Sequence, residues 1–218
     1  SNIIISKEHQ TGVAGIHVDS NTGQNAITVI RGAPASFTKD EIDINVIKKS
    51  KIFLTQLEIP IDVTLYCLKK AKESGLVNIL NPAPACKLDK EFFSLADYFT
   101  PNEAEAEFYT GVKINNENDA KESAKKLLEL GLKKVIITLG EKGLFYSDGK
   151  EEIYIKALPF KKVEDTTGAG DAFNGGLAYA LSKNKNIKEC LNIANQVAGL
   201  STLKLGAGNS MPSLTDLK

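Results

Sequence analysis

Residues 119–140 read DAKESAKKLLELGLKKVIITLG, and this stretch decides the class of fold. Its first half has the apolar spacing of an amphipathic helix, which we predict over residues 119–130 with Gly131 as the cap. Its second half, residues 135–139, is rich in β-branched side chains and predicts a strand that ends before Gly140. A helix that leads into an apolar strand is typical of α/β proteins with parallel sheets.

The same alternation extends to both sides of this stretch. Further strands are expected at residues 51–57, 77–80 and 98–100, and further helices at residues 60–74, 170–182 and 187–203. Residues 143–155 predict a hairpin that turns at Asp148-Gly149. Because the strands are short and nearly continuous apolar runs, we predict a parallel sheet covered by helices on both faces. Ligands in such folds bind beyond the carboxyl ends of the strands.

The start of the chain has a different pattern. Residues 12–18 and 25–30 predict two β segments. Residues 19–23, DSNTG, have the turn chemistry that would join these segments. This region is therefore expected to form a hairpin.

Composition limits the possible functions. The 218 residues carry 27 Lys and Arg against 27 Asp and Glu, so binding to nucleic acid or to a membrane surface through bulk charge is not expected. No apolar run approaches the roughly 20 residues of a membrane span, and the first residues lack the order of a secretory signal. Three scattered cysteines, Cys67, Cys86 and Cys190, predict reduced thiols in a cytoplasmic protein. His9 and His17 have no partner pattern and are assigned no chemistry.

The strongest chemical signal is the stretch DTTGAGDAFNGG at residues 165–176, where two glycines precede an apolar helix. Glycine lets the backbone approach a ligand, and the N–H groups of a helix start attract anions. Asp171 would lie beside a bound phosphoryl group and could take the proton of an attacking hydroxyl, late in the transfer because aspartate is a weak base. By spacing alone, a glycine-rich helix start capped by Asp165 or Thr167 is an equal alternative.

At this stretch the sequence resembles a known family, the ribokinase-like or PfkB-type carbohydrate kinases. Five further stretches resemble motifs of that family in the same order along the chain. They are residues 54–58 (LTQLE), 81–85 (NPAPA), 101–107 (PNEAEAE) with Thr110-Gly111, 137–143 (ITLGEKG) and 204–212 (KLGAGNSMP). The resemblance covers nearly the whole chain. It implies a ribokinase-like three-layer αβα fold with a mainly parallel central sheet and part of a small β lid.

The resemblance also implies an ATP-dependent sugar kinase and a role for each matching residue. Asp171 would be the base, and Glu58 would contact the sugar together with Asp171. The anion hole would consist of Gly168, Ala169, Gly170 and the amide of Asp171. The nucleotide would be bound by Asn102, Thr138, Gly140, Gly170 and Asn195. Glu105 would organise Mg²⁺ through water. A potassium ion would be held by the Asp165 side chain and by Thr167, Ser201 and Gly206, with Ser210 nearby.

Several of these roles have plainer alternatives. Asn102 and Glu105 have the spacing of a helix cap, Glu58 could be a solvated loop charge, and Asn195 could be a satisfied polar residue of the core. The motif wording favours ribose as the acceptor, with fructose, another sugar or a nucleoside as alternatives. A non-catalytic nucleotide-binding fragment is the alternative from a different class.

The resemblance finally divides the chain into two parts. Residues 1–32 would be a partial β lid and its return strand, through which the full-length protein is expected to form a homodimer. Residues 33–218 would be the nucleotide-binding and catalytic α/β domain. Nothing before residue 11 resembles the family's N-terminal third, which carries most of the sugar clamp. By itself, the chain is therefore expected to bind ATP but to phosphorylate ribose poorly.

Overall fold

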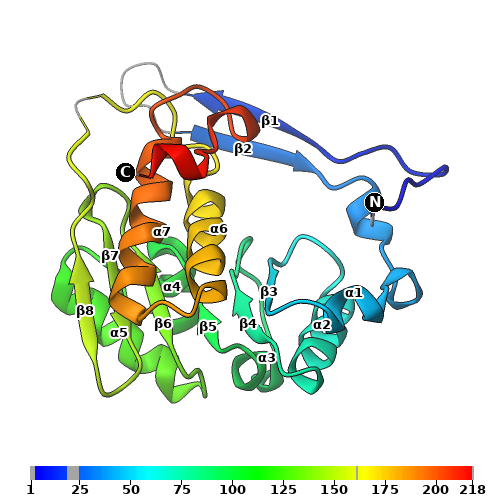
Figure 1. The fold of residues 1–218 in the computed structure, drawn as a ribbon, viewed down its shortest axis with the longest axis horizontal. Helices are drawn as coiled ribbons and strands as arrows, with labels where there is room; N and C mark the ends of the chain where they lie inside the picture. The colour runs from blue at the N-terminus through cyan, green and yellow to red at the C-terminus, as the bar shows by residue number, and fades with distance from the viewer. Residues whose placement is uncertain (1–2, 19–24, 161, 218) are drawn as a thin grey trace.

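The computed structural model describes residues 3–18, 25–160 and 162–217, which form a two-stranded and a six-stranded sheet (Figure 1). The strands are β1 (Val13–Val18), β2 (Asn25–Ile30), β3 (Ile52–Thr55), β4 (Val77–Leu80), β5 (Tyr98–Phe99), β6 (Val135–Thr138), β7 (Leu144–Ser147) and β8 (Glu152–Ile155). In the larger sheet the strands follow one another in chain order from β3 to β8. Strands β3 to β6 are parallel, whereas β7 and β8 are antiparallel to their neighbours. The prediction of a mainly parallel sheet is confirmed.

Helices cover both faces of the larger sheet. They are α1 (Ile44–Lys48), α2 (Ile61–Glu73), α3 (Lys90–Leu95), α4 (Glu103–Thr110), α5 (Glu117–Glu129), α6 (Ala169–Ser182) and α7 (Ile187–Ser201). In β6, Val135 and Ile137 pack in the core formed with α2 to α5, whereas Ile136 packs in the core formed with α6 and α7. This alternation follows from the two-residue period of a strand, and each such buried side chain stabilises the fold by about 1.5–3 kcal/mol. The result is the expected three-layer αβα domain.

The β1–β2 hairpin lies apart from this domain, along the top of the view in Figure 1. Val13 pairs with Ile30, and both side chains are largely exposed. The chain leaves the hairpin through Gly32, where φ is 58° and a Cβ would lie only 2.5 Å from the Gln10 carbonyl oxygen, so the position requires glycine. The turn expected at residues 19–23 lies outside the described residues, and the domain boundary expected after residue 32 stays a prediction.

The structure differs from the sequence prediction mainly in its short helices. Helices α1 and α3 have five and six residues and no counterpart among the predicted elements. One or two turns are too short to display a 3.6-residue apolar repeat. The four long predicted helices form as α2, α5, α6 and α7, with ends within two residues of those expected. In the described ranges, no helix combines the length and the apolar character that a membrane span needs.

Candidate active site

Helix α6 begins at the glycine-rich stretch that the sequence singles out. Gly168 is its N-cap residue and has a φ of 78°, in the left-handed region that favours glycine. A Cβ on Gly168 would lie 3.1 Å from the Met211 side chain and 3.3 Å from the Ala207 side chain. The loop after α7 therefore packs closely on the start of α6, as expected if the two segments share one site.

The first turn of α6 offers backbone donors to an anion. Gly170 and Asp171 lie within this turn, where N–H groups have no carbonyl partner in the helix. The Ala169 N–H differs, because it donates to the Thr166 carbonyl at 3.2 Å. The anion hole predicted for residues 168–171 therefore has the expected helix-start geometry, but the Ala169 amide is already engaged.

A cavity of about 450 Å³ lies beside Asp171. Glu58, which follows β3, lines the same cavity, so the two residues predicted to contact a sugar are brought together. Both residues are exposed to solvent. Within the described part of the chain, the residues that line it are Pro34, Leu54, Thr55, Gln56, Glu58, Ile59, Asn81, Asp171 and Asn174.

The cavity also contains polar residues to which the sequence analysis assigns no role. Gln56 donates from Nε2 to Asp171 Oδ1 at 2.8 Å and to Asn81 Oδ1 at 3.2 Å. Gln56 directly follows β3, and Asn81 directly follows β4. Their position as polar residues at the carboxyl ends of neighbouring parallel strands is the signal that could have identified them.

The residues predicted to bind the nucleotide phosphates meet at the ends of the next two strands. Asn102, shortly after β5, forms an isolated parallel bridge with Thr138 at the end of β6. The Thr138 N–H donates to the Pro101 carbonyl at 2.9 Å. Gly140 follows with a φ of 54° and begins a 3₁₀ turn that ends at Lys142. Asn102, Thr138 and Gly140 thus lie at the carboxyl end of the sheet, next to the strands β3 and β4 whose carboxyl ends line the cavity.

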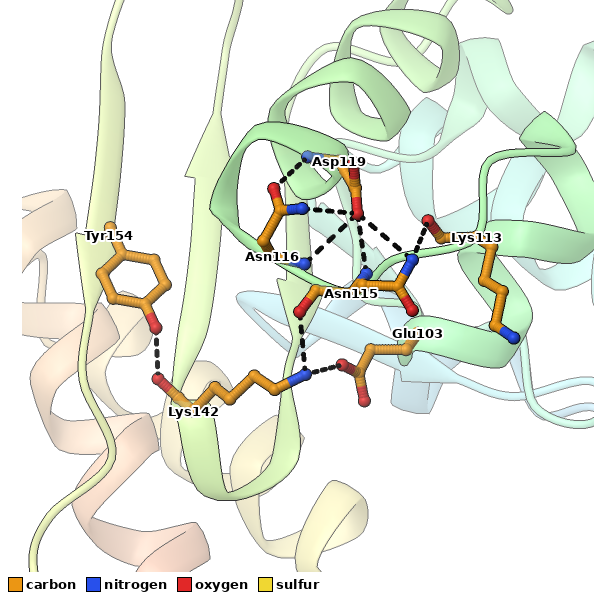
Figure 2. Close-up of polar contacts among 7 residues, drawn as sticks. All are labelled: Glu103, Lys113, Asn115, Asn116, Asp119, Lys142 and Tyr154. Atoms are coloured by element: carbon orange, nitrogen blue, oxygen red, sulfur yellow. Dashed lines mark hydrogen bonds and ion pairs between the residues drawn. The ribbon is translucent and has the colours of Figure 1, made fainter.

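The 3₁₀ turn after β6 contacts α4, the segment before α5, and β8, as Figure 2 shows. Lys142 Nζ lies 3.4 Å from Glu103 Oε1 in α4 and donates to the Asn115 carbonyl, before α5, at 3.3 Å. The Tyr154 hydroxyl of β8 donates to the Lys142 carbonyl at 2.7 Å. Asn116 caps α5 and exchanges hydrogen bonds with Asp119. These contacts hold the turn that begins at Gly140.

Asn102 and Glu105 form a capping box at the start of α4. Asn102 Oδ1 accepts from the Glu105 N–H at 2.8 Å, and Glu105 Oε2 accepts from the Asn102 N–H at 2.8 Å. Burial raises the pKa of Glu105 to about 7, although the hydrogen bond from the Asn102 N–H acts in the opposite direction. No cationic side chain contributes to this balance. The structure therefore shows the plainer alternative, in which Asn102 and Glu105 cap helix α4. A hydrated Mg²⁺ also fits, because it would supply positive charge to a buried carboxylate.

Asp165 connects the approach to α6 with the loop after α7. Its Oδ1 accepts from the Thr167 N–H at 2.8 Å, and its Oδ2 accepts from the Gly206 N–H at 2.9 Å. Hydrogen bonds from the Thr167 side chain, the Thr167 N–H and the Gly206 N–H hold the pKa of Asp165 below its ordinary value. Three of the residues predicted to hold potassium therefore meet, but the Thr167 and Gly206 contacts seen here are made by N–H groups and not by carbonyls. An ionised, buried carboxylate fits a monovalent cation chemically, because the cation would supply the opposite charge.

The remaining predicted residues make local contacts. The Ser201 hydroxyl donates to the Ala198 carbonyl, and the Ser210 hydroxyl donates to the Ala207 carbonyl, each at 2.7 Å. Asn195 Nδ2 donates to the Lys156 carbonyl at 2.9 Å, which joins α7 to the segment after β8. This bond satisfies the Asn195 amide nitrogen, but the residue is half-buried and does not belong to the core, and its adenine role stays a prediction. In the described part of the chain, no group of three or more His, Cys, Asp or Glu residues could hold a metal ion.

The protein is a three-layer α/β domain in which the carboxylate of Asp171 lies at a helix start beyond the carboxyl ends of parallel strands. The model of the pfkB family of carbohydrate kinases matches residues 1–214, and the chain belongs to this family. The predicted family, fold and enzyme class are thereby confirmed.

The chain is similar to several proteins named ribokinase. It is 37% identical to a ribokinase of Staphylococcus aureus over all of this chain and 72% of that protein. It is 39% identical to a bifunctional ribokinase/ribose-5-phosphate isomerase A of Fructilactobacillus sanfranciscensis, over 97% of this chain and 39% of that protein. The structure of Arabidopsis thaliana ribokinase with ribose and ATP is similar at a TM-score of 0.87 and 30% identity, over 96% of this chain and 69% of that one. The chain thus spans less than three quarters of the length of each of these proteins.

Proposed function

We propose that the protein is an ATP-dependent sugar kinase that converts D-ribose and ATP to D-ribose 5-phosphate and ADP. The observation that carries this proposal is the position of Asp171 in the first turn of α6, in one cavity with Glu58. The relatives named ribokinase support ribose as the acceptor, and the Arabidopsis structure with ribose and ATP supports ATP as the donor.

In the proposed reaction, an acceptor oxygen attacks the γ-phosphorus of ATP. The bond between that phosphorus and the β–γ bridging oxygen breaks, and ADP leaves. The proton of the attacking hydroxyl passes to the carboxylate of Asp171 late in the transfer, since aspartate is too weak a base to remove it earlier. The N–H groups in the first turn of α6 face the negative charge of the transferred group.

Two cations belong to the proposal. Glu105 would hold a hydrated Mg²⁺, which neutralises phosphate charge when bound. Asp165, with the loop residues Thr167 and Gly206 that it contacts, would hold K⁺ behind the anion hole and fix its backbone. Replacing K⁺ by Na⁺ or Li⁺ at constant ionic strength should lower the rate several-fold, and equal rates with the three ions would contradict the potassium site.

The test of the proposed function is ADP release in a coupled assay with ribose, fructose, adenosine and no acceptor. It is run on residues 1–218 and on the complete reading frame that contains them. ATP-analogue binding is measured in parallel by calorimetry. Ribose-dependent ADP release supports the proposal. Faster ADP release with fructose or adenosine would mean that the protein is a kinase of the same family with a different acceptor. Nucleotide binding without transfer to any acceptor in either protein would favour a non-catalytic nucleotide-binding protein.

We also propose that β1 and β2 pair with a second copy of the protein. Apolar side chains on one face of the two strands are exposed, with Ile16 of β1 at 43% and Val29 of β2 at 54%. Burying these side chains between two copies would remove apolar surface from water. Sedimentation over a range of concentrations tests this, because Val29→Lys should shift a dimer toward monomer.

A further inference from the structure

Asp171 is one end of a continuous chain of hydrogen bonds that crosses the carboxyl ends of three strands. Gln56, after β3, donates to Asp171 Oδ1 at 2.8 Å and to Asn81 Oδ1 at 3.2 Å. Asn81, after β4, donates from Nδ2 to the carbonyl of Thr100 at 2.8 Å. Thr100 directly follows β5. Each step therefore moves one strand further along the parallel part of the sheet.

The chain of hydrogen bonds then returns to α6. The Thr100 hydroxyl donates to Asn174 Oδ1 at 2.7 Å, and Asn174 Nδ2 donates to the Gly170 carbonyl at 2.9 Å. Because Gly170 precedes Asp171, the hydrogen bonds close into a ring through one peptide bond. We call the side chains of Gln56, Asn81, Thr100 and Asn174 the amide ring.

The chemistry of its partners gives every amide of the ring a single orientation. The two backbone carbonyls can only accept, so Asn81 and Asn174 must turn their nitrogen atoms toward them. The oxygen of Asn81 then faces Gln56, and the oxygen of Asn174 faces the Thr100 hydroxyl. Gln56 must present its nitrogen, because an ionised carboxylate only accepts. No alternative flip satisfies the same set of contacts.

Burial makes this arrangement costly to break. Asn81, Thr100 and Asn174 are 7%, 2% and 4% exposed, so a lost partner would leave a buried polar atom unsatisfied. Asp171 is exposed, and its side chain would rotate more freely without Gln56. Three buried residues and the half-buried Gln56 therefore restrain the exposed carboxylate that the proposed reaction uses as its base.

We propose that Gln56 is a positioning residue for Asp171, that Asn81 holds Gln56, and that Thr100 and Asn174 hold the other end of the ring at the Gly170 carbonyl, next to Asp171. This inference rests on the proposed kinase function. Gln56 gives one N–H to Asp171 and the other to Asn81, so both of its donors are used within the ring. It fixes Oδ1 of the base and leaves the acceptor hydroxyl to Oδ2. Loss of the ring should therefore lower kcat more than it changes the KM for the sugar.

The decisive variant is Thr100→Val, which removes one hydroxyl and preserves shape. Thr100 does not line the cavity, so it cannot act by touching the sugar. We expect Gln56→Leu and Thr100→Val each to lower kcat about tenfold, as for loss of a hydrogen bond to a charged or buried group. In each variant the KM for the sugar and the KM for ATP should stay within twofold of the parent values. The double variant should lose little more than either single variant, because both break the same ring.

Two matched variants separate positioning from general structural damage. Thr100→Ser keeps the hydroxyl and should restore kcat to within threefold of the parent. Thr64→Val removes another fully buried hydroxyl, which bonds to the Pro60 carbonyl in α2, and should leave kcat unchanged. A raised sugar KM with unchanged kcat in Gln56→Leu would mean that Gln56 binds the sugar, and would overturn the proposal. Equal losses in Thr100→Val and Thr64→Val, at matched loss of stability, would overturn it as well.

A spectroscopic measurement tests the ring independently of catalysis. The side-chain amide signal of Gln56 is followed by NMR in ¹⁵N-labelled protein. It should shift in Asp171→Asn and also in Thr100→Val, but not in Thr64→Val. If no protein transfers phosphate, the proposed function fails while this measurement still decides whether the ring exists. If the parent is active but the Gln56 amide signal does not shift in Thr100→Val, the inference fails and the proposed function stands.

Discussion

The two ends of the central sheet hold their polar side chains in opposite ways. At the amino end, Asp97 lies 2.6 Å from Lys72 Nζ and 3.2 Å from Lys133 Nζ, and it accepts from the Asn78 N–H at 3.0 Å. At the carboxyl end, the amide ring holds Asp171 through neutral groups. A lysine beside Asp171 would pair with the carboxylate that is proposed to accept a proton, whereas a neutral amide restrains it without a charge pair. The comparison shows that lysines hold Asp97 at one end of the sheet, whereas neutral hydrogen bonds hold the proposed base at the other.

The largest effect should come from removing the carboxylate at each end in turn. Asp171→Asn should lower the rate of ADP release with ribose by about two to four orders of magnitude, as is typical for loss of a general base. Binding of an ATP analogue should stay within twofold. The matched variant Asp97→Asn should keep its rate within twofold. A rate for Asp171→Asn within tenfold of the parent would contradict its role as the base.

The second prediction concerns stability at the amino end. Burial raises the pKa of Asp97, but hydrogen bonds from Lys72, the Asn78 N–H and Lys133 outweigh burial and hold the pKa below its ordinary value. The charged form is therefore favoured in the folded state. This stabilisation is present above the ordinary pKa of aspartate and is lost as the pH falls through the lowered pKa.

Asp97→Asn should therefore lower the free energy of unfolding by about 2 kcal/mol at pH 7, on the scale of hydrogen bonds to charged groups. Urea unfolding of the parent and the variant, at pH 7 and again near pH 3, measures the difference. It should shrink at the acid end, below the ordinary pKa of aspartate, where the unfolded parent takes up a proton at Asp97 before the folded parent does. A difference independent of pH would show that the cluster acts through shape and not through charge.

The sequence predicts the strand ends and helix starts on which the candidate site is built better than it predicts the hydrogen bonds between the side chains of that site. Thr138, Gly140 and Asp171 were predictable because each stands where a strand ends or a helix starts, and those boundaries follow from local patterns. The apolar period likewise predicts the long helices. Helices α1 and α3 escape prediction because a helix of one or two turns shows no period.

The amide ring could not be predicted in the same way. Gln56 is 25 residues from Asn81 in sequence, and Asn81 is 19 residues from Thr100, so their contacts depend on the register of β3, β4 and β5. Only the three-dimensional arrangement shows that their side chains meet. The capping box of Asn102 and Glu105 illustrates the opposite case, because its contacts are local and the spacing alone predicts them.

The third prediction compares two asparagines of one segment. Asn78, in β4, donates to the Leu68 and Leu95 carbonyls at 2.9 and 3.1 Å near the amino end. Asn81 belongs to the amide ring at the carboxyl end. Asn81→Ser should lower kcat about tenfold, since Gln56 loses its second contact. Asn78→Ser should lower the midpoint of thermal unfolding but leave kcat within twofold. Similar effects of both variants on kcat would show that the two ends are not functionally distinct.

The smallest effect is expected where a charge pair lies at the carboxyl end but outside the ring. Lys142 joins the 3₁₀ turn after β6 to Glu103 at 3.4 Å, with side chains 46% and 37% exposed, so water and salt screen this pair (Figure 2). Lys142→Met should raise the dissociation constant of an ATP analogue only two- to threefold, and less at 0.5 M salt than at 0.05 M.

The matched control is Lys121→Met, which removes a surface pair of α5 and β8, with Glu152 at 2.7 Å, and leaves both contacts of the Lys142 side chain intact. Calorimetry on the three proteins at both salt concentrations measures the effect, and Lys121→Met should bind the analogue like the parent. A tenfold weakening that persists at high salt in Lys142→Met would mean that Lys142 contacts the phosphates directly. In that case a cation would serve the chemistry at the carboxyl end, and the division between charged and neutral ends would hold for the base but not for the nucleotide.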